Sequence, residues 1–271
     1  MLIDFHTHVF PDKIAKRAIE SLESNVIRMQ GKNYPAVTDG SLGELIRTMA
    51  EDGVDYSVVL PIATTVKQSE SINRFAKEIN GKNGIISFGS VHPMQEDYER
   101  VLEGIAEAGL RGIKLHPEYQ GTFVTSPEVK RVVKKATELG LYVVFHAGRD
   151  IGMPEPVHCM PECLNSLLDY VDGSKLIAAH MGGWKLWDDV EKYIVGTPIM
   201  IDTSYVGGFM SPEQFKRIVE THGSEKILYG TDHPWERAYD SKRFVDSVGL
   251  KQEELDNIYF KNAIRLLDIE L

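Results

Sequence analysis

Two histidines stand one residue apart near the start of the chain, in the run Asp4-Phe5-His6-Thr7-His8. Side chains alternate between the faces of a strand, so His6 and His8 point to the same side if this run is extended. Two imidazoles at that spacing can bind one metal ion, because imidazole is a favoured ligand of zinc and its neighbours. The pair alone is a weak signal, since a solvated pair at a strand end has the same sequence.

Further histidines and an aspartate stand at the carboxyl ends of later apolar runs. These residues are His116, His146, His180 and Asp232. In a barrel of parallel strands those ends meet at one mouth, where active sites are housed. A single such residue could be a buried structural histidine, as we expect for His92. Several in register indicate a shared site.

Eight short apolar runs alternate with amphipathic segments along the chain. The predicted strands are Leu2–His6, Tyr56–Ile62, Ile85–Val91, Gly112–His116, Tyr142–His146, Lys175–His180, Ile199–Thr203 and Ile227–Thr231. Strict alternation implies parallel strands joined by helical crossovers. We therefore predict an α/β fold, a closed (β/α)8 TIM barrel, as a single domain over residues 1–271. A doubly wound open sheet is the alternative, but no Gly-x-Gly-x-x-Gly follows the first strand.

Helix start signals support this alternation. A serine followed by a proline is an N-cap and a first-turn residue, and this pair precedes the predicted helices Pro127–Leu139 and Glu213–Thr221. Residues 25–40 lack clear periodicity and form a longer connection than usual, which we expect to fold over the barrel mouth.

The motifs together resemble those of the amidohydrolase superfamily, in the branch of TIM-barrel metal-dependent hydrolases that includes aminocarboxymuconate-semialdehyde decarboxylase-like enzymes. The resemblance spans the chain, from Asp-Phe-His-Thr-His through Gly-Ile-Lys-Leu-His-Pro, Phe-His-Ala-Gly and Ala-His-Met-Gly-Gly to Gly-Thr-Asp-His-Pro-Trp. It implies that His6, His8, His146 and Asp232 bind the metal. It also implies that His180 is the acid/base or oxyanion-stabilising histidine beside it.

The implied ligand set has coherent chemistry. Three neutral imidazoles and a carboxylate leave room on the ion for water, as a catalytic site requires. The ion lowers the pKa of that water towards ~7. Asp232 could then contact the metal and accept the proton, while His180 polarises a carbonyl or protonates a leaving group. The expected cofactor is a divalent ion, zinc first and manganese second.

Lys114 leaves the number of metal ions open. Some relatives carry a carboxylated lysine at the end of the fourth strand that bridges two metals, and Lys114 with His146 and His180 would complete such a set. A free Lys114 ammonium could instead bind a substrate carboxylate. We favour one metal, because Lys114 and His116 share one strand face and the decarboxylase-like branch is mostly mononuclear.

Substrate contacts are predicted from position. Arg149, three residues after His146, could hold a carboxylate with both guanidinium nitrogens, or form a surface ion pair. Trp184 and Trp235 could line an aromatic pocket or pack beneath the loops. The predicted substrate-binding residues are Lys114, His116, Arg149, Trp184 and Trp235, with His158, Tyr119, Tyr205 and Arg237 as further loop candidates. Asp4, one step deeper on the face of His6, is predicted to support the ligands.

The charge and the hydrophobicity of the chain disfavour nucleic acids and membranes as its partners. The net charge of −10 disfavours nucleic acid, and no stretch approaches the ~20 apolar residues of a membrane span. With no secretion-like leader, we expect a cytoplasmic protein whose partner is a small-molecule substrate, and a homo-oligomer would fit such a barrel. The two cysteines, Cys159 and Cys163, are expected to be reduced thiols, because no second ligand pair lies at zinc-finger spacing.

The sequence thus predicts a metal-dependent hydrolase, with a metal-activated water attacking an amide, lactone or ester of a small molecule. The alternative is non-oxidative decarboxylation of a small carboxylic acid, which uses the same metal ligands and would be favoured by Arg149. A non-catalytic metal-binding protein is the third hypothesis. We disfavour it because every acid/base position is filled.

Overall fold

The computed structural model describes residues 1–270, and over this range the strands follow the predicted order. They are β1 (Ile3–Thr7), β2 (Tyr56–Val59), β3 (Ile85–Ser87), β4 (Gly112–Leu115), β5 (Tyr142–Phe145), β6 (Leu176–Ala178), β7 (Met200–Asp202) and β8 (Ile227–Leu228). Each overlaps its predicted counterpart, and most end sooner. Apart from His6, which lies within β1, the polar residues that close the predicted runs therefore lie just beyond the strands, where the backbone leaves the sheet.

The strands form a ring of parallel neighbours in chain order. Strands β1 to β3 pair in one sheet and β4 to β8 in another. Backbone contacts join the two sheets at both seams, through a bridge between Gly89 and Ile113 and another between Thr7 and His233. The Phe5 amide also donates to the Tyr229 carbonyl at 2.7 Å. The (β/α)8 barrel prediction is confirmed.

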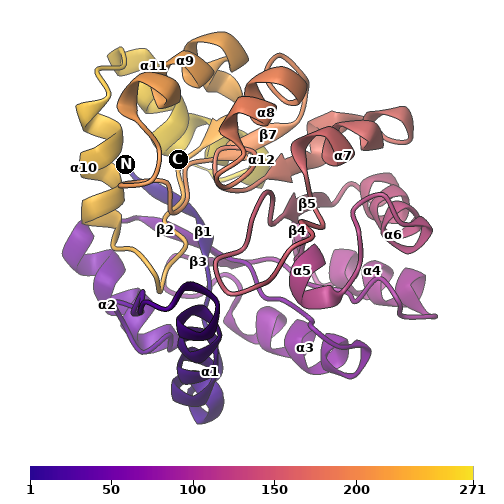
Figure 1. Cartoon of the computed structure of the whole chain (residues 1–271). Coiled ribbons are helices and arrows are strands. Elements are labelled where there is room, and N and C mark those ends of the chain that lie inside the picture. The colour runs from indigo at the N-terminus through magenta and orange to yellow at the C-terminus, as the bar shows by residue number, and fades with distance from the viewer. Residues whose placement is uncertain (271) are drawn as a thin grey trace.

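Helices surround this ring (Figure 1). They are α1 (Asp12–Gln30), α2 (Leu42–Asp52), α3 (Ser69–Ile79), α4 (Tyr98–Glu107), α5 (Pro117–Gln120), α6 (Pro127–Glu138), α7 (Pro161–Asn165), α8 (Trp187–Tyr193), α9 (Pro212–His222), α10 (Ala238–Ser247), α11 (Gln252–Asp256) and α12 (Asn262–Leu267). The predicted caps are present, since the Ser126 and Ser211 side chains accept from amides in the first turns of α6 and α9. None of the helices within residues 1–270 is both long and apolar enough to cross a bilayer.

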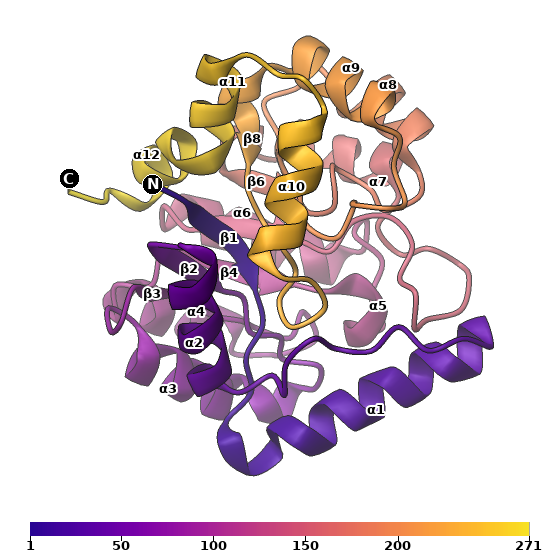
Figure 2. The same cartoon turned by 90° about the vertical axis from the view of Figure 1, so that its left-hand side faces the viewer.

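Helix α1 corrects one expectation. Residues 25–30 were predicted to be irregular, but α1 continues through them and ends at Gly31, whose φ of 64° is left-handed. The apolar pattern is obscured there because Ile27 and Met29 are exposed while Val26 is buried. Figure 2 shows α1 in indigo along the lower edge of the molecule, with the loop after it returning towards the barrel.

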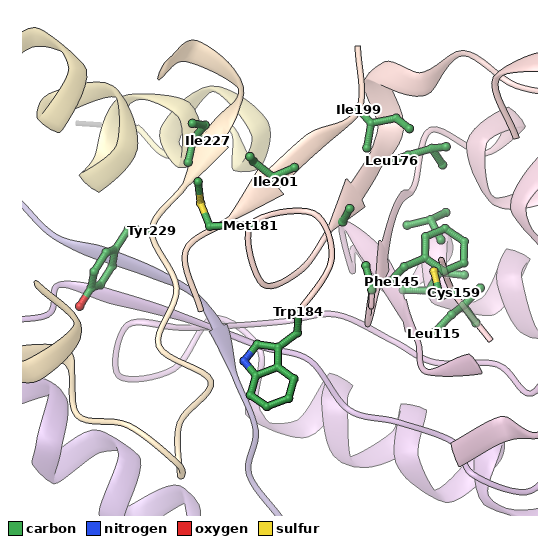
Figure 3. Packing of buried hydrophobic residues seen from close by; sticks show 14 of the residues in the cluster. Leu115, Phe145, Cys159, Leu176, Met181, Trp184, Ile199, Ile201, Ile227 and Tyr229 are labelled. Atoms are coloured by element: carbon green, nitrogen blue, oxygen red, sulfur yellow. The ribbon is translucent and has the colours of Figure 1, made fainter. Parts of the chain in front are cut away.

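Two clusters of buried apolar residues hold the barrel. The smaller contains Ile3 and Phe5, which alternate along β1, together with Leu266 and Leu267 of α12. The larger lies between strands and helices and includes Phe145, as Figure 3 shows. Burial on this scale stabilises at about 25 cal/mol per Å² of apolar surface. The strand ends are thereby held on a rigid frame.

Candidate metal centre and active site

His6, His8 and Asp232 meet where β1 ends beside the segment that follows β8. The Nε2 atoms of His6 and His8 are 3.1 Å apart. The Asp232 Oδ1 atom lies 3.4 Å from the first and 3.1 Å from the second. Asp232 has a left-handed φ of 68°, a conformation that costs energy outside glycine and is concentrated at functional sites.

The protons of both imidazoles are directed away from this meeting point. His8 Nδ1 lies 2.8 Å from the Leu60 carbonyl oxygen, which only accepts, so Nδ1 donates and Nε2 carries a lone pair. His6 Nδ1 donates in the same way to Asp202 Oδ2 at 2.8 Å. Burial lowers the pKa of His6 to about 3, helped by the charge of Lys114, so the ring is neutral at pH 7.

Two lone pairs and a carboxylate oxygen therefore face one another. Groups that only accept hydrogen bonds repel at such distances, and a cation between them removes the repulsion. A neutral imidazole whose far nitrogen donates to a carboxylate or carbonyl is the usual form of a metal-ligating histidine. This donor set fits a divalent metal ion, with nitrogen and oxygen ligands that suit zinc or manganese.

Asp202 beneath the pair was not singled out from the sequence. Besides holding His6, its carboxylate accepts from the His180 and Ser204 amides, both at 3.0 Å. Burial opposes its ionisation, but the hydrogen bonds from His6 and Ser204 outweigh burial and hold the pKa of Asp202 below its ordinary value. The available signal was its position, since Asp202 is a carboxylate inside the apolar run of the seventh predicted strand.

His146 and His180 form a second close pair. His180 Nδ1 donates to the Ser204 carbonyl at 3.0 Å, and His146 Nε2 donates to the Arg149 carbonyl at 3.2 Å. The remaining nitrogens, His180 Nε2 and His146 Nδ1, are 3.0 Å apart. One proton or one cation between them makes this contact favourable. Like Asp232, His180 has a left-handed φ, here 60°.

His116 and Asp150 extend this pair. The His116 ring stacks on His146 with centroids 4.2 Å apart, and its Nε2 lies 3.3 Å from Asp150 Oδ2. The ligand atoms of His116, His146 and Asp150 lie within 4.8 Å of one another, so they form a second group able to hold a cation. Burial lowers the pKa of His116 and His146 well below the ordinary value. Asp150 is in an irregular loop and gave no sequence signal.

Lys114 lies on the floor between these groups. Its side chain is 0% exposed, and its Nζ is 3.1 Å from His6 Nε2. Burial lowers the pKa of Lys114 to about 8, against the attraction of Asp202 and Asp232. The structure thus brings Lys114 to the His6 side of the site.

A cavity of about 400 Å³ opens above these residues. Its walls include the predicted site residues His8, Lys114, His116, His146, Arg149, His180, Trp184, Asp232 and Trp235. His6 is fully buried beneath it. Of the loop candidates, Tyr119 and Tyr205 line the cavity.

Other predicted contacts are placed differently. The Arg149 side chain is 47% exposed and pairs with Glu155 at the rim. Arg237 lies away from the cavity, in an ion pair with Asp52 at 2.7 Å. Trp184, labelled in Figure 3, donates from Nε1 to the Tyr205 carbonyl at 3.1 Å, so it both packs and lines the cavity.

Asp4 supports the site through the backbone. It is buried, and its carboxylate accepts from the Thr231 amide at 3.0 Å and from the Thr231 hydroxyl at 2.6 Å. These bonds fix the residue that precedes Asp232. Burial raises the pKa of Asp4 to about 7. Cys159 and Cys163 are free thiols.

Comparisons with known proteins identify the family and the fold. The family model described as Amidohydrolase matches residues 3–269. None of the curated proteins matches the chain.

Several solved structures share the fold at low sequence identity. A 5-carboxyvanillate decarboxylase from Novosphingobium aromaticivorans, with bound manganese and 3-methoxy-4-hydroxy-5-nitrobenzoic acid, is 14% identical with a TM-score of 0.72, over 99% of this chain and 97% of that one. A protein from Pseudomonas putida described as a 2-pyrone-4,6-dicarboxylic acid hydrolase is 15% identical with a TM-score of 0.68, over 100% and 98%. A TIM-barrel protein from Bordetella bronchiseptica is 16% identical with a TM-score of 0.73, over 98% of both chains.

Proposed function

The chain belongs to the amidohydrolase family, and we propose that His6, His8, His146 and Asp232 hold a divalent metal ion for the hydrolysis of a small amide, lactone or ester. The observation that carries this proposal is the meeting of His6 Nε2, His8 Nε2 and Asp232 Oδ1 with their protons committed elsewhere. His146, which follows β5, would add its Nδ1 lone pair from beside His180. Zinc is our first choice, and manganese is supported by the ion in the decarboxylase of similar fold.

Such an ion supplies a water of lowered pKa and polarises the carbonyl under attack. The chain's own residues move the protons. Asp232 Oδ1, beside His6 Nε2 and His8 Nε2, is the carboxylate oxygen placed to accept the proton of that water. His180 Nε2, held in place through Nδ1 by the Ser204 carbonyl, would take up the proton that Asp232 accepts from the water and pass it to the leaving group.

Metal content per chain tests the proposal directly. We would measure it by inductively coupled plasma mass spectrometry on protein purified without chelator or affinity metal. About one equivalent supports the set of His6, His8, His146 and Asp232. About two would bring Lys114 and His180 into the ligand set with His146. No metal, even after adding ions back, would overturn the proposal.

Activity is then tested on neutral esters, lactones and amides. Metal-stripped protein should be inactive and should regain turnover with zinc or manganese. Lys251 is exposed and lies outside the cavity, so a Lys251→Ala variant is a control that should lose and regain activity like wild type. Turnover that survives complete removal of the metal would contradict the proposed chemistry.

Decarboxylation is the second candidate. It is supported by the structural likeness to 5-carboxyvanillate decarboxylase and by the Lys114 cation at the floor of the cavity. Release of carbon dioxide from aromatic carboxylic acids, without turnover of any ester, lactone or amide, would favour this candidate over hydrolysis.

The cavity and the two cysteines also indicate the kind of partner and the cellular compartment of the enzyme. Its partner is a small molecule that fits the 400 Å³ cavity. Free Cys159 and Cys163 suit a reducing compartment, so we place the enzyme in the cytoplasm.

A further inference from the structure

Helix α1 turns an apolar stripe towards the cavity instead of towards the core. The stripe recurs at every fourth residue and consists of Ile14, Ala18, Leu22 and Val26. At 1.5 Å per residue it runs for about 18 Å along the helix. Ala15 and Ile19, on the adjacent face, are buried and attach α1 to the protein. The stripe is thus available to a bound molecule.

Other residues that line the cavity are also apolar. It is formed by residues that follow β2 and by α3, with an aromatic side chain before α1 and one isoleucine after β5. These residues are Ile62, Ile72, Phe75, Phe10 and Ile151. Apolar and aromatic walls with a few polar groups at one end are typical of sites for a largely apolar ligand.

Cations are scarce among the residues that line the cavity. Lys114 and Arg149 are the two present. Lys114 is fully buried and in contact with His6, while the half-exposed Arg149 pairs with Glu155. The lining also contains two carboxylates, Asp150 and Asp232. A carboxylate placed along α1 would therefore lose water without gaining a free cation, which is costly.

Building on the proposed hydrolysis, we propose that the substrate is an uncharged ester, lactone or amide whose apolar acyl or aryl group lies along the α1 stripe. The ester, lactone or amide group that is hydrolysed binds at the polar end of the cavity, beside His8, Asp232 and His180. The stripe and the other apolar residues of the lining take the apolar group. A substrate with a carboxylate at the far end of that group is rejected.

Hydroxamic acids test this assignment by binding, without turnover. Their hydroxamate chelates a divalent metal, so the rest of the molecule extends from the polar end. We would titrate metal-loaded enzyme with acetohydroxamic, hexanohydroxamic and octanohydroxamic acids by calorimetry. Each added methylene should tighten Kd by roughly twofold to fourfold, from the value of a buried methylene. The monohydroxamate of octanedioic acid, which ends in a carboxylate, should bind at least roughly tenfold more weakly than octanohydroxamic acid.

A charge placed in the stripe should reverse this preference. Leu22→Lys puts a cation where the chain end lies, so the ratio of the two eight-carbon Kd values should shift by roughly tenfold towards the carboxylate. Ser21→Lys adds the same charge on an exposed neighbouring position outside the cavity and should leave the ratio unchanged. Thermal melting of both variants checks that they fold alike.

The outcomes separate the two proposals. Equal Kd values along the series, or tighter binding of the carboxylate by wild type, would overturn the apolar substrate class. An unchanged ratio in Leu22→Lys, with normal melting, would remove α1 from the binding site. If acetohydroxamic acid shows no metal-dependent binding, the metal assignment and the proposed hydrolysis fail instead.

Discussion

The polar end of the cavity and the α1 wall are built in opposite ways. At the polar end, His6, His8 and His180 each have a fixed hydrogen-bond partner on the nitrogen away from the centre. Along α1, the cavity-facing residues Ala18 and Leu22 are only partly buried. One region is set by the ends of barrel strands and the other by a helix outside the ring. Chemistry and substrate choice are therefore separable parts of this molecule.

The strongest test of the polar end is Asp232→Asn. We expect kcat/KM to fall by roughly 10²–10⁴, because the amide is a poor proton acceptor and a poor metal ligand. Metal retained after dialysis should fall as well. Turnover at the wild-type rate would remove Asp232 from the mechanism.

His180→Asn separates proton transfer from metal binding. It should abolish most turnover, again by roughly 10²–10⁴, while the metal content stays at one equivalent. The Asn side chain keeps a polar group next to Ser204, so thermal melting should change little. Loss of one of two equivalents would instead identify His180 as a metal ligand.

Asp202→Asn tests whether metal binding at the polar end depends on the hydrogen bond between His6 and Asp202. The amide no longer fixes the proton of His6 on Nδ1, so metal affinity should fall by roughly 10-fold to 100-fold. Competition with a fluorescent chelator measures this. Asp256→Asn, at an exposed ion pair on α11, is the control that should bind metal like wild type.

Leu22→Ala should have the smallest effect and touch only the α1 wall. Metal content should equal that of wild type, and kcat/KM for an apolar ester should fall by roughly threefold to tenfold, from the lost apolar contact. The rate for an acetyl ester, which is too short to reach the stripe, should be unchanged. Equal losses on both esters would mean that the two regions are coupled.

The barrel and the residues at its mouth were predictable because both depend on local pattern. Apolar runs alternating with amphipathic segments specify strands and helices, and the polar residues His146, His180 and Asp232 stand out at the ends of those runs. Their grouping follows from parallel strands alone. The family match over residues 3–269 confirms the resemblance to the amidohydrolases.

What escaped prediction depends on contacts between distant residues. Asp150 meets His116 across two loops, and Arg149 is paired by a glutamate that no pattern marks. Helix α1 was cut short in prediction because its apolar stripe faces a cavity, so Ile27 and Met29 on its outer side blur the period. The apolar pattern by which helices are recognised is weaker in a helix whose apolar residues line a cavity than in one that packs against the core.

The seam between the first strand and the last links this site to folding. Asp4 and Thr231 are joined across 227 positions of the chain, and His8 meets Asp232 at the same seam. The nascent chain must therefore be complete to this point before His6 and His8, the first of the proposed metal ligands, meet Asp232. An ion that binds only the closed ring stabilises it by RT ln(1 + [M]/Kd), where [M] is the free metal concentration. At the proposed site, a bound metal ion would therefore join the first strand of the barrel to the segment that follows the last strand.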